Sequence, residues 1–164
     1  MITEDYVSFE VVKLLKEKGF KESTRLVWYE HLPSPNAVYN SEIGKPKRDY
    51  FYWEKDGERN SPWTNDSPVP SYINGEVYSC PSHQMAIKWL REVHNIFIQM
   101  ERDNQYYEGT PVTPITEHDK KRGHSSEYYA VVLDAKSNSN SFEHFDRYEE
   151  AVEAALKYSL ENLI

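Results

Sequence analysis

Aromatic residues are concentrated in one stretch of this chain, and that stretch constrains the fold more than any other feature. Of the 23 aromatic residues (13 Tyr, 4 Trp and 6 Phe), 10 lie between positions 28 and 78. Leu, Ile, Val and Phe together make up only 35 of 164 residues, or 21 %. Strongly charged chains with less than roughly 20 % of these residues stay disordered. Because each packed aromatic side chain buries about 150–250 Å², the aromatic residues must supply part of the core.

Two segments of this stretch are typical of β-strands with two apolar faces. They cover residues 25–31 and 49–54, and the Asp56-Gly57 pair that follows is typical of a tight turn. Alternate side chains of a strand point to opposite faces, so both faces of such strands present aromatic or branched residues. We expect such a sheet to be covered twice, by helices, by the proline-rich loop, by a second subunit or by a ligand.

Three segments carry the signals of helix ends. Ser8 as an N-cap and Gly19 as a left-handed stop predict a helix over residues 9–18. Ser82 predicts the start of a second helix that ends near His94. The last helix is expected to start at Asp146, with Glu149 completing a capping box, and to run toward the C-terminus.

The remaining patterns predict short strands and long connections. Strands are expected at 76–80, 96–101 and 129–133, the last two as antiparallel neighbours, while the Ser/Asn run from Ser137 to Ser141 is interpreted as a linker. The order α-β-β-(β)-α-β-β-α predicts an α+β fold, an antiparallel sheet packed with about three helices. We expect one domain over residues 1–164, with long loops at 32–48, 58–75 and 103–126.

The net charge and the hydrophobic pattern make some classes of binding partner unfavourable. The formal net charge is -8, which makes duplex nucleic acid an unfavourable partner, because affinity for it comes from neutralising phosphates. No stretch approaches the roughly 18 apolar residues of a membrane span, and the first residues do not form a basic and then apolar leader. We therefore expect a cytoplasmic protein. Cys80 is the only cysteine, which agrees with a reducing compartment.

Three segments of the chain are similar to those of a known family. They are Met1 to Phe20 (MITEDYVSFEVVKLLKEKGF), Gln84 to Asn95 (QMAIKWLREVHN) and Tyr148 to Ile164 (YEEAVEAALKYSLENLI). Together they resemble a family of small uncharacterised proteins encoded by gut bacteria and by their phages or mobile elements. The resemblance covers the three expected helices, roughly 50 of 164 residues. It implies an accessory gene product in the interplay of phage and host, and it implies no activity and no site residues.

The aromatic stretch is also the basis of the functional hypothesis. Aromatic side chains with a few cationic neighbours can stack a planar ligand and clamp its phosphate, or can form a protein-binding surface. We therefore expect a non-enzymatic binding module for a small molecule, such as a nucleotide, or for a protein partner, with a homodimer as one form of such an interface. The candidate ligand-binding residues are Arg25, Trp28, Tyr29, Arg48, Tyr52, Trp53, Trp63 and Tyr72.

An enzyme is the alternative hypothesis. His118, Asp119 and His124 lie in one polar loop, and imidazole with carboxylate suits a divalent metal, so they could serve a metal-dependent phosphoester hydrolase. Flexible loops rarely supply convergent ligands by themselves, and a solvated loop is the simpler interpretation. The sequence contains no GxSxG, Walker A, GxGxxG, HExxH or CxxC motif, so we expect no cofactor and assign no catalytic residues.

Some polar residues of the helices carry no functional signal. Glu149 and Glu150 fit the first turn of the last helix, and Glu153 lies off its apolar stripe, so all three are interpreted as a solvated face. His83 is a single histidine near the start of the second helix. The sequence gives no reason to place any of these residues in a site.

Overall fold

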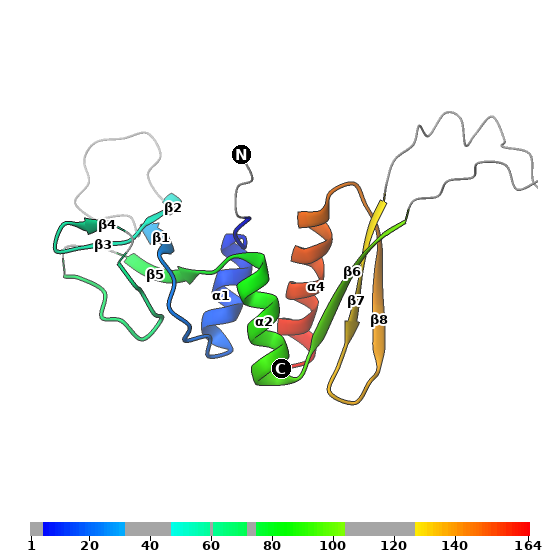
Figure 1. Ribbon diagram of the computed structural model, residues 1–164. Coiled ribbons are helices and arrows are strands. Elements are labelled where there is room, and N and C mark those ends of the chain that lie inside the picture. The colour runs from blue at the N-terminus through cyan, green and yellow to red at the C-terminus, as the bar shows by residue number, and fades with distance from the viewer. Residues whose placement is uncertain (1–4, 32–46, 60, 72–74, 104–126) are drawn as a thin grey trace, which may run out of the picture.

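The computed structural model describes residues 5–31, 47–59, 61–71, 75–103 and 127–164 of the chain. Three helices form a central layer, with one small antiparallel sheet on each side of it (Figure 1). The predicted α+β class is therefore confirmed, although the strands form separate sheets on opposite sides of the helices instead of a single sheet.

The first helix is set by local signals at both ends. Helix α1 (Phe9–Glu17) has Ser8 as its N-cap, and Gly19 follows it with a φ of 85°. The N–H of Phe20 donates to the carbonyl of Leu15 at 2.8 Å, which is the bond that closes a Schellman motif. The helix predicted for residues 9–18 is confirmed, because capping and a left-handed glycine act within a few residues of chain.

The second helix follows the same logic. Helix α2 (His83–His94) begins after Ser82, whose hydroxyl accepts a hydrogen bond from the backbone N–H of Met85 at 3.4 Å. It ends at Asn95, which adopts the left-handed conformation with a φ of 56°. The predicted start and end of this helix are both confirmed.

The start of the last helix differs from the sequence-based expectation. Helix α4 (Tyr148–Asn162) has Arg147 as its N-cap, with no capping bond from the side chain. The predicted capping box of Asp146 and Glu149 is therefore wrong, because the helix begins one residue later and its N-cap side chain makes no capping bond. The buried stripe agrees with its apolar spacing and consists of Ala151, Val152, Ala155, Leu156, Ser159 and Leu160.

The first sheet contains the aromatic strands. Its order is β2-β1-β5, all antiparallel, formed by β1 (Leu26–His31), β2 (Lys47–Tyr52) and β5 (Gly75–Cys80). A small hairpin of β3 (Glu54–Lys55) and β4 (Glu58–Arg59) turns at Asp56-Gly57, where the φ angles are 54° and 80°. Positive φ at both central residues is the geometry of a two-residue hairpin turn, so the predicted turn is confirmed.

Both faces of the first sheet are covered by the chain itself. Leu26 and Trp28 belong to the main core with α1, while Val27 and Tyr29 belong to a second cluster on the opposite face. The second cluster is completed by Val77, Trp53 and Trp63, and the two indole rings lie 4.4 Å apart between centroids. Trp53 and Trp63 thus cover the second face, and paired backbone hydrogen bonds between Thr24 and Trp63 hold Trp63 in place.

The second sheet contains a strand that the sequence analysis missed. Its order is β6-β7-β8, formed by β6 (Phe97–Asp103), β7 (Glu127–Leu133) and β8 (Ser139–Phe145). The predicted antiparallel pairing of 96–101 with 129–133 is confirmed. The interpretation of Ser137–Ser141 as a linker holds for Ser137 and Asn138 and is wrong for Ser139–Ser141, because β8 pairs with β7 and places the ring of Phe142 5.0 Å from that of Tyr158 on α4.

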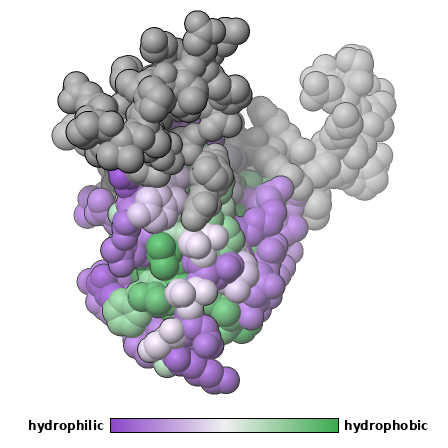
Figure 2. Space-filling model, turned by 90° about the vertical axis from the view of Figure 1, so that its right-hand side faces the viewer, coloured by the Kyte–Doolittle hydropathy of each residue, from purple (hydrophilic) through white to green (hydrophobic). Residues whose placement is uncertain are grey.

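The outer face of this second sheet carries a hydrophobic patch. Phe97 is 44 % exposed there, directly opposite Leu133 in the register, and Val131 lies on the same face. Figure 2 shows this side of the molecule, with hydrophobic residues surrounded by hydrophilic ones. None of the helices in the described residues is long and apolar enough to cross a membrane.

Candidate functional site

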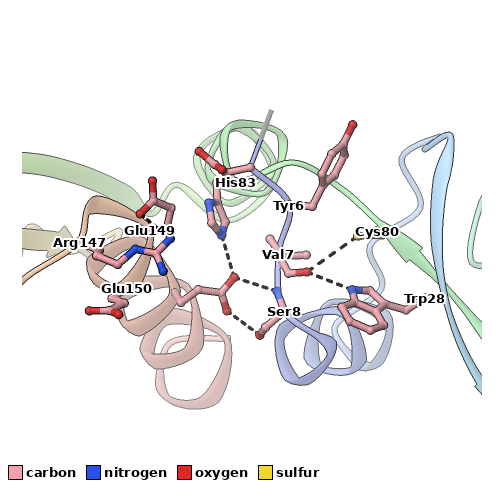
Figure 3. A pocket seen from close by; sticks show the side chains of 11 residues that line it. Tyr6, Val7, Ser8, Trp28, Cys80, His83, Arg147, Glu149 and Glu150 are labelled. Atoms are coloured by element: carbon pink, nitrogen blue, oxygen red, sulfur yellow. Dashed lines mark hydrogen bonds and ion pairs between the residues drawn. The ribbon is translucent and has the colours of Figure 1, made fainter. Parts of the chain in front are cut away.

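A cavity of about 550 Å³ lies at one end of the helix layer (Figure 3). We call it the helix-end cavity. Its volume lies within the range of about 300–1,000 Å³ that is usual for small-molecule sites. It is lined by Asp5, Tyr6, Val7, Ser8, Trp28, Cys80, His83, Arg147, Glu149, Glu150 and Glu153.

The cavity forms where the three helices begin. In Figure 1 all three helices start at the same end of their layer. The residues at these starts all line the cavity: Ser8 is the N-cap of α1, His83 is the first residue of α2 and Arg147 is the N-cap of α4. The N–H groups of a first helical turn have no partner within the helix and carry a partial positive charge. Side chains and ligands with acceptor atoms are therefore favoured at this end of the layer.

Glu153 already occupies the centre of this arrangement. Its Oε1 accepts hydrogen bonds from the backbone N–H of Ser8 at 2.9 Å and from Nε2 of His83 at 2.8 Å, and its Oε2 accepts one from the Ser8 hydroxyl at 2.6 Å. Burial opposes the charge of this carboxylate, but the bonds from His83 and Ser8 outweigh it and hold the pKa of Glu153 below its usual value. Glu153 thus connects α4 to the starts of α1 and α2.

His83 is buried beside this carboxylate. Its side chain is only 6 % exposed, and its backbone N–H donates to the carbonyl of Asp5 at 3.0 Å. Because Nε2 faces the ionised carboxylate, it carries a proton and donates this hydrogen bond. Nδ1 is buried and has no hydrogen-bond partner among the described residues. Only one of the two ring nitrogens of His83 therefore has a hydrogen-bond partner among the described residues.

The opposite wall of the cavity is apolar. Trp28 is half-buried; its Nε1 donates to the carbonyl of Val7 at 3.1 Å, and its ring meets Phe9 edge-on. Cys80 lies beneath the same carbonyl and is 1 % exposed. Burial, reinforced by the nearby charge of Glu153, raises the pKa of the Cys80 thiol to about 12. This wall offers an aromatic surface and an uncharged thiol.

Charged side chains surround the opening. Arg147 pairs with Glu149, with Nη2 and Oε2 3.3 Å apart. Asp5 and Glu150 are exposed and form no ion pair with any other described residue. In Figure 3 Arg147, Glu149 and Glu150 lie on one side of the Val7–Ser8 segment, and Tyr6 and Trp28 lie on the other. The cavity therefore has an acidic side and an aromatic side.

The ligand-binding residues predicted from the sequence do not all meet at this cavity. Trp28 lines it. Trp53 and Trp63 are 6 % and 2 % exposed and lie in the cluster on the other face of the sheet, where Tyr29 packs against them. Tyr52 is 42 % exposed, with the guanidinium of Arg59 5.1 Å from its ring centroid. Arg25 is exposed, and its backbone carbonyl accepts a hydrogen bond from Trp53.

Several predicted residues lie outside the described residues. Tyr72 is one of them, and nothing is described of the side chain of Arg48. The candidate metal ligands His118, Asp119 and His124 also lie outside. Among the residues that the structure does describe, no group of three or more His, Cys, Asp or Glu side chains could hold a metal ion. The metal-dependent hydrolase thus stays an untested alternative.

The sequence analysis missed most of the cavity. The expectation that Glu153 belongs to a solvated face is wrong, because its side chain is only 25 % exposed and accepts three hydrogen bonds. The helix starts at Ser8 and Ser82 are both visible as capping signals in the sequence. What the sequence does not contain is the information that these starts converge, since Ser8 and Glu153 are 145 residues apart.

The chain was compared with protein-family models, with curated proteins and with solved structures, and nothing among them matches it. The family resemblance of the three helical segments therefore stays a prediction. The function of the helix-end cavity has to be argued from its own geometry.

Proposed function

We propose that this chain is a non-enzymatic binding module that takes up a small molecule in the helix-end cavity. The observation that carries the proposal is a cavity of about 550 Å³ with an aromatic wall and a fixed polar floor. Ligand sites usually combine apolar walls with a few well-placed polar groups. Trp28 supplies the wall, and the hydrogen-bonded group of Ser8, His83 and Glu153 supplies the floor.

The chemistry of the floor supports binding over covalent catalysis. A thiol with a pKa of about 12 is ionised in only about one molecule in 10⁵ at neutral pH, so Cys80 is a poor nucleophile. The Ser8 hydroxyl donates a hydrogen bond to Glu153 and, as the N-cap, accepts one from the N–H of Val11. His83 contacts Glu153 and not Ser8, whereas an activated serine needs the imidazole between hydroxyl and carboxylate. These contacts hold the groups in place for recognition.

A thermal-shift screen tests the proposal. The purified protein is screened against amines, amino acids, nucleotides, sugars and organic acids at about pH 7. A ligand at about 100 times its Kd stabilises the folded state by about 2.7 kcal/mol. For a chain of this size that raises Tm by about 5–10 °C. The proposal expects at least one such ligand, with saturable binding confirmed by calorimetry.

A matched pair of variants localises the binding. Tyr6 lines the cavity and Tyr158 does not, and both side chains are half-buried. Tyr6→Leu is expected to weaken the ligand by about fivefold or more, whereas Tyr158→Leu leaves its Kd unchanged. A screen without any saturable ligand, or equal effects of both variants, contradicts the proposed function.

A further inference from the structure

We infer that the ligand of the helix-end cavity is an organic cation, an ammonium or guanidinium group on an aromatic or apolar body. This inference rests on the proposed function, because it concerns the chemistry of the same cavity. This ligand class differs from the nucleotide that the sequence analysis suggested, because a nucleotide carries a negatively charged phosphate.

The charges of the lining residues favour a cation. Four carboxylates and one guanidinium line the cavity. The guanidinium of Arg147 is already paired with Glu149, so it is not available in full to an anionic ligand. Asp5 and Glu150 have no ion-pair partner among the described residues. A positively charged ligand would complete two ion pairs at this opening, whereas a phosphate would meet both carboxylates.

The helix starts oppose this preference without reversing it. Each helix N-terminus acts like about half a positive charge. Glu153 is bonded at the starts of α1 and α2, and Glu149 and Glu150 lie in the first turn of α4. Three such partial charges and one guanidinium amount to less than the four carboxylates. The cavity therefore remains negative, and it would attract a cation at neutral pH.

The aromatic wall suits the rest of such a ligand. Trp28 and Tyr6 lie on the side of the cavity away from Arg147 (Figure 3). Indole and phenol rings attract cations through their faces when the charge lies within about 6 Å of the ring centroid. They also bury the apolar body of an amine. The cavity thus offers carboxylates to the cationic group of such a ligand and an aromatic wall to its apolar body.

Three indoles that share the indole-3-ethyl body and differ in the terminal group and its charge test this inference. Tryptamine carries an ammonium group, tryptophol a neutral hydroxyl and indole-3-propionate a carboxylate. Calorimetry at about pH 7 and low salt is expected to give tryptamine at least a tenfold lower Kd than tryptophol, with indole-3-propionate weakest. In the thermal-shift screen, cationic compounds such as agmatine are expected to raise Tm more than their neutral counterparts, and anionic compounds are expected to raise it least.

Variants of the opening assign the preference to its carboxylates. Asp5→Asn with Glu150→Gln is expected to raise the Kd of tryptamine about fivefold or more and to leave that of tryptophol unchanged. Both residues are exposed, so the double variant should fold normally. Glu161→Gln is the matched control, because this exposed residue of α4 does not line the cavity and should leave both Kd values unchanged.

The outcomes separate this inference from the proposed function. The inference of a cationic ligand is wrong if the three indoles have equal Kd values or if the acid binds most tightly. It is also wrong if the best ligands of the screen are anionic or neutral. In each of these cases the proposed binding in the cavity still stands. An unchanged tryptamine Kd in the double variant would overturn the inference of a cationic ligand as well. If neither the screen nor any indole binds, the proposed function itself fails.

Discussion

Replacing Glu153 by Gln tests whether this carboxylate connects the three helices. The substitution keeps the size of the side chain and removes its charge. The wild-type carboxylate accepts from the Ser8 backbone, the Ser8 hydroxyl and His83. A Gln carboxamide can keep the three contacts, with its oxygen accepting from the Ser8 backbone and His83 and its NH₂ group donating to the Ser8 hydroxyl oxygen. The acceptor is then no longer charged, so all three hydrogen bonds are weaker.

The expected cost follows from these contacts. A hydrogen bond to a charged group contributes about 1.5–3 kcal/mol and one between neutral groups about 0.5–1.5 kcal/mol, so each of the three bonds loses about 1 kcal/mol. Because the Glu153 side chain is 25 % exposed, water can relieve part of this cost. We therefore expect the free energy of unfolding to fall by about 2–4 kcal/mol. For a chain of this size, Tm should fall by about 5–15 °C.

The pH dependence gives a second readout of the same contact. The folded-state pKa of Glu153 is lowered from the ordinary value of 4.5. Its contribution to stability is therefore present in full above that value and is lost as the pH falls through the lowered folded-state pKa. The stability difference between wild type and Glu153→Gln should be constant from about pH 7 to pH 5 and should shrink below about pH 4.5. Urea unfolding followed by tryptophan fluorescence measures it at each pH.

Glu150→Gln is the control for this experiment. Glu150 lies one turn earlier on the same helix, is exposed and has no ion-pair partner in the described part of the chain. Its replacement should change the free energy of unfolding by no more than about 0.5 kcal/mol. The reasoning is refuted if Glu153→Gln is equally mild, or if its stability deficit persists unchanged at low pH.

Three further predictions concern other parts of the structure. Trp63→Ala removes a ring that is 2 % exposed and uncovers one face of the first sheet, so urea unfolding should show a loss of about 3–5 kcal/mol; a loss below about 1 kcal/mol would mean that this face does not need its cover. Gly19→Ala places a β-carbon at a φ of 85° and should cost about 1 kcal/mol, with Gly19→Asn milder in the same assay; equal stability of all three chains would contradict the Schellman ending. The Cys80 thiol, with its pKa of about 12, should react with a disulfide reagent at about pH 8 only as fast as the protein unfolds, and rapid labelling of the native protein would contradict its burial.

Local structure in this chain follows from short-range signals in its sequence. Ser8, Ser82 and Gly19 mark helix ends because caps and left-handed residues act on backbone groups within a few positions. The alternation of Leu26 and Val27 determined that the aromatic strands would have two apolar faces, because strand side chains alternate by geometry. These signals were sufficient for the α+β class and for most of its elements.

How these elements assemble depends on contacts between distant parts of the chain. Strand β8 is mostly polar in sequence and exists because it pairs with β7 and because Phe142 packs against α4. The sequence pattern of the last helix predicts Glu153 on its solvated face. In the folded chain its side chain is hydrogen-bonded to Ser8 and His83, which are 145 and 70 residues away. No local rule brings three helix starts to one end of a layer. The cavity and its charge are therefore properties of packing, and the residues that line it could be recognised only once the chain was folded.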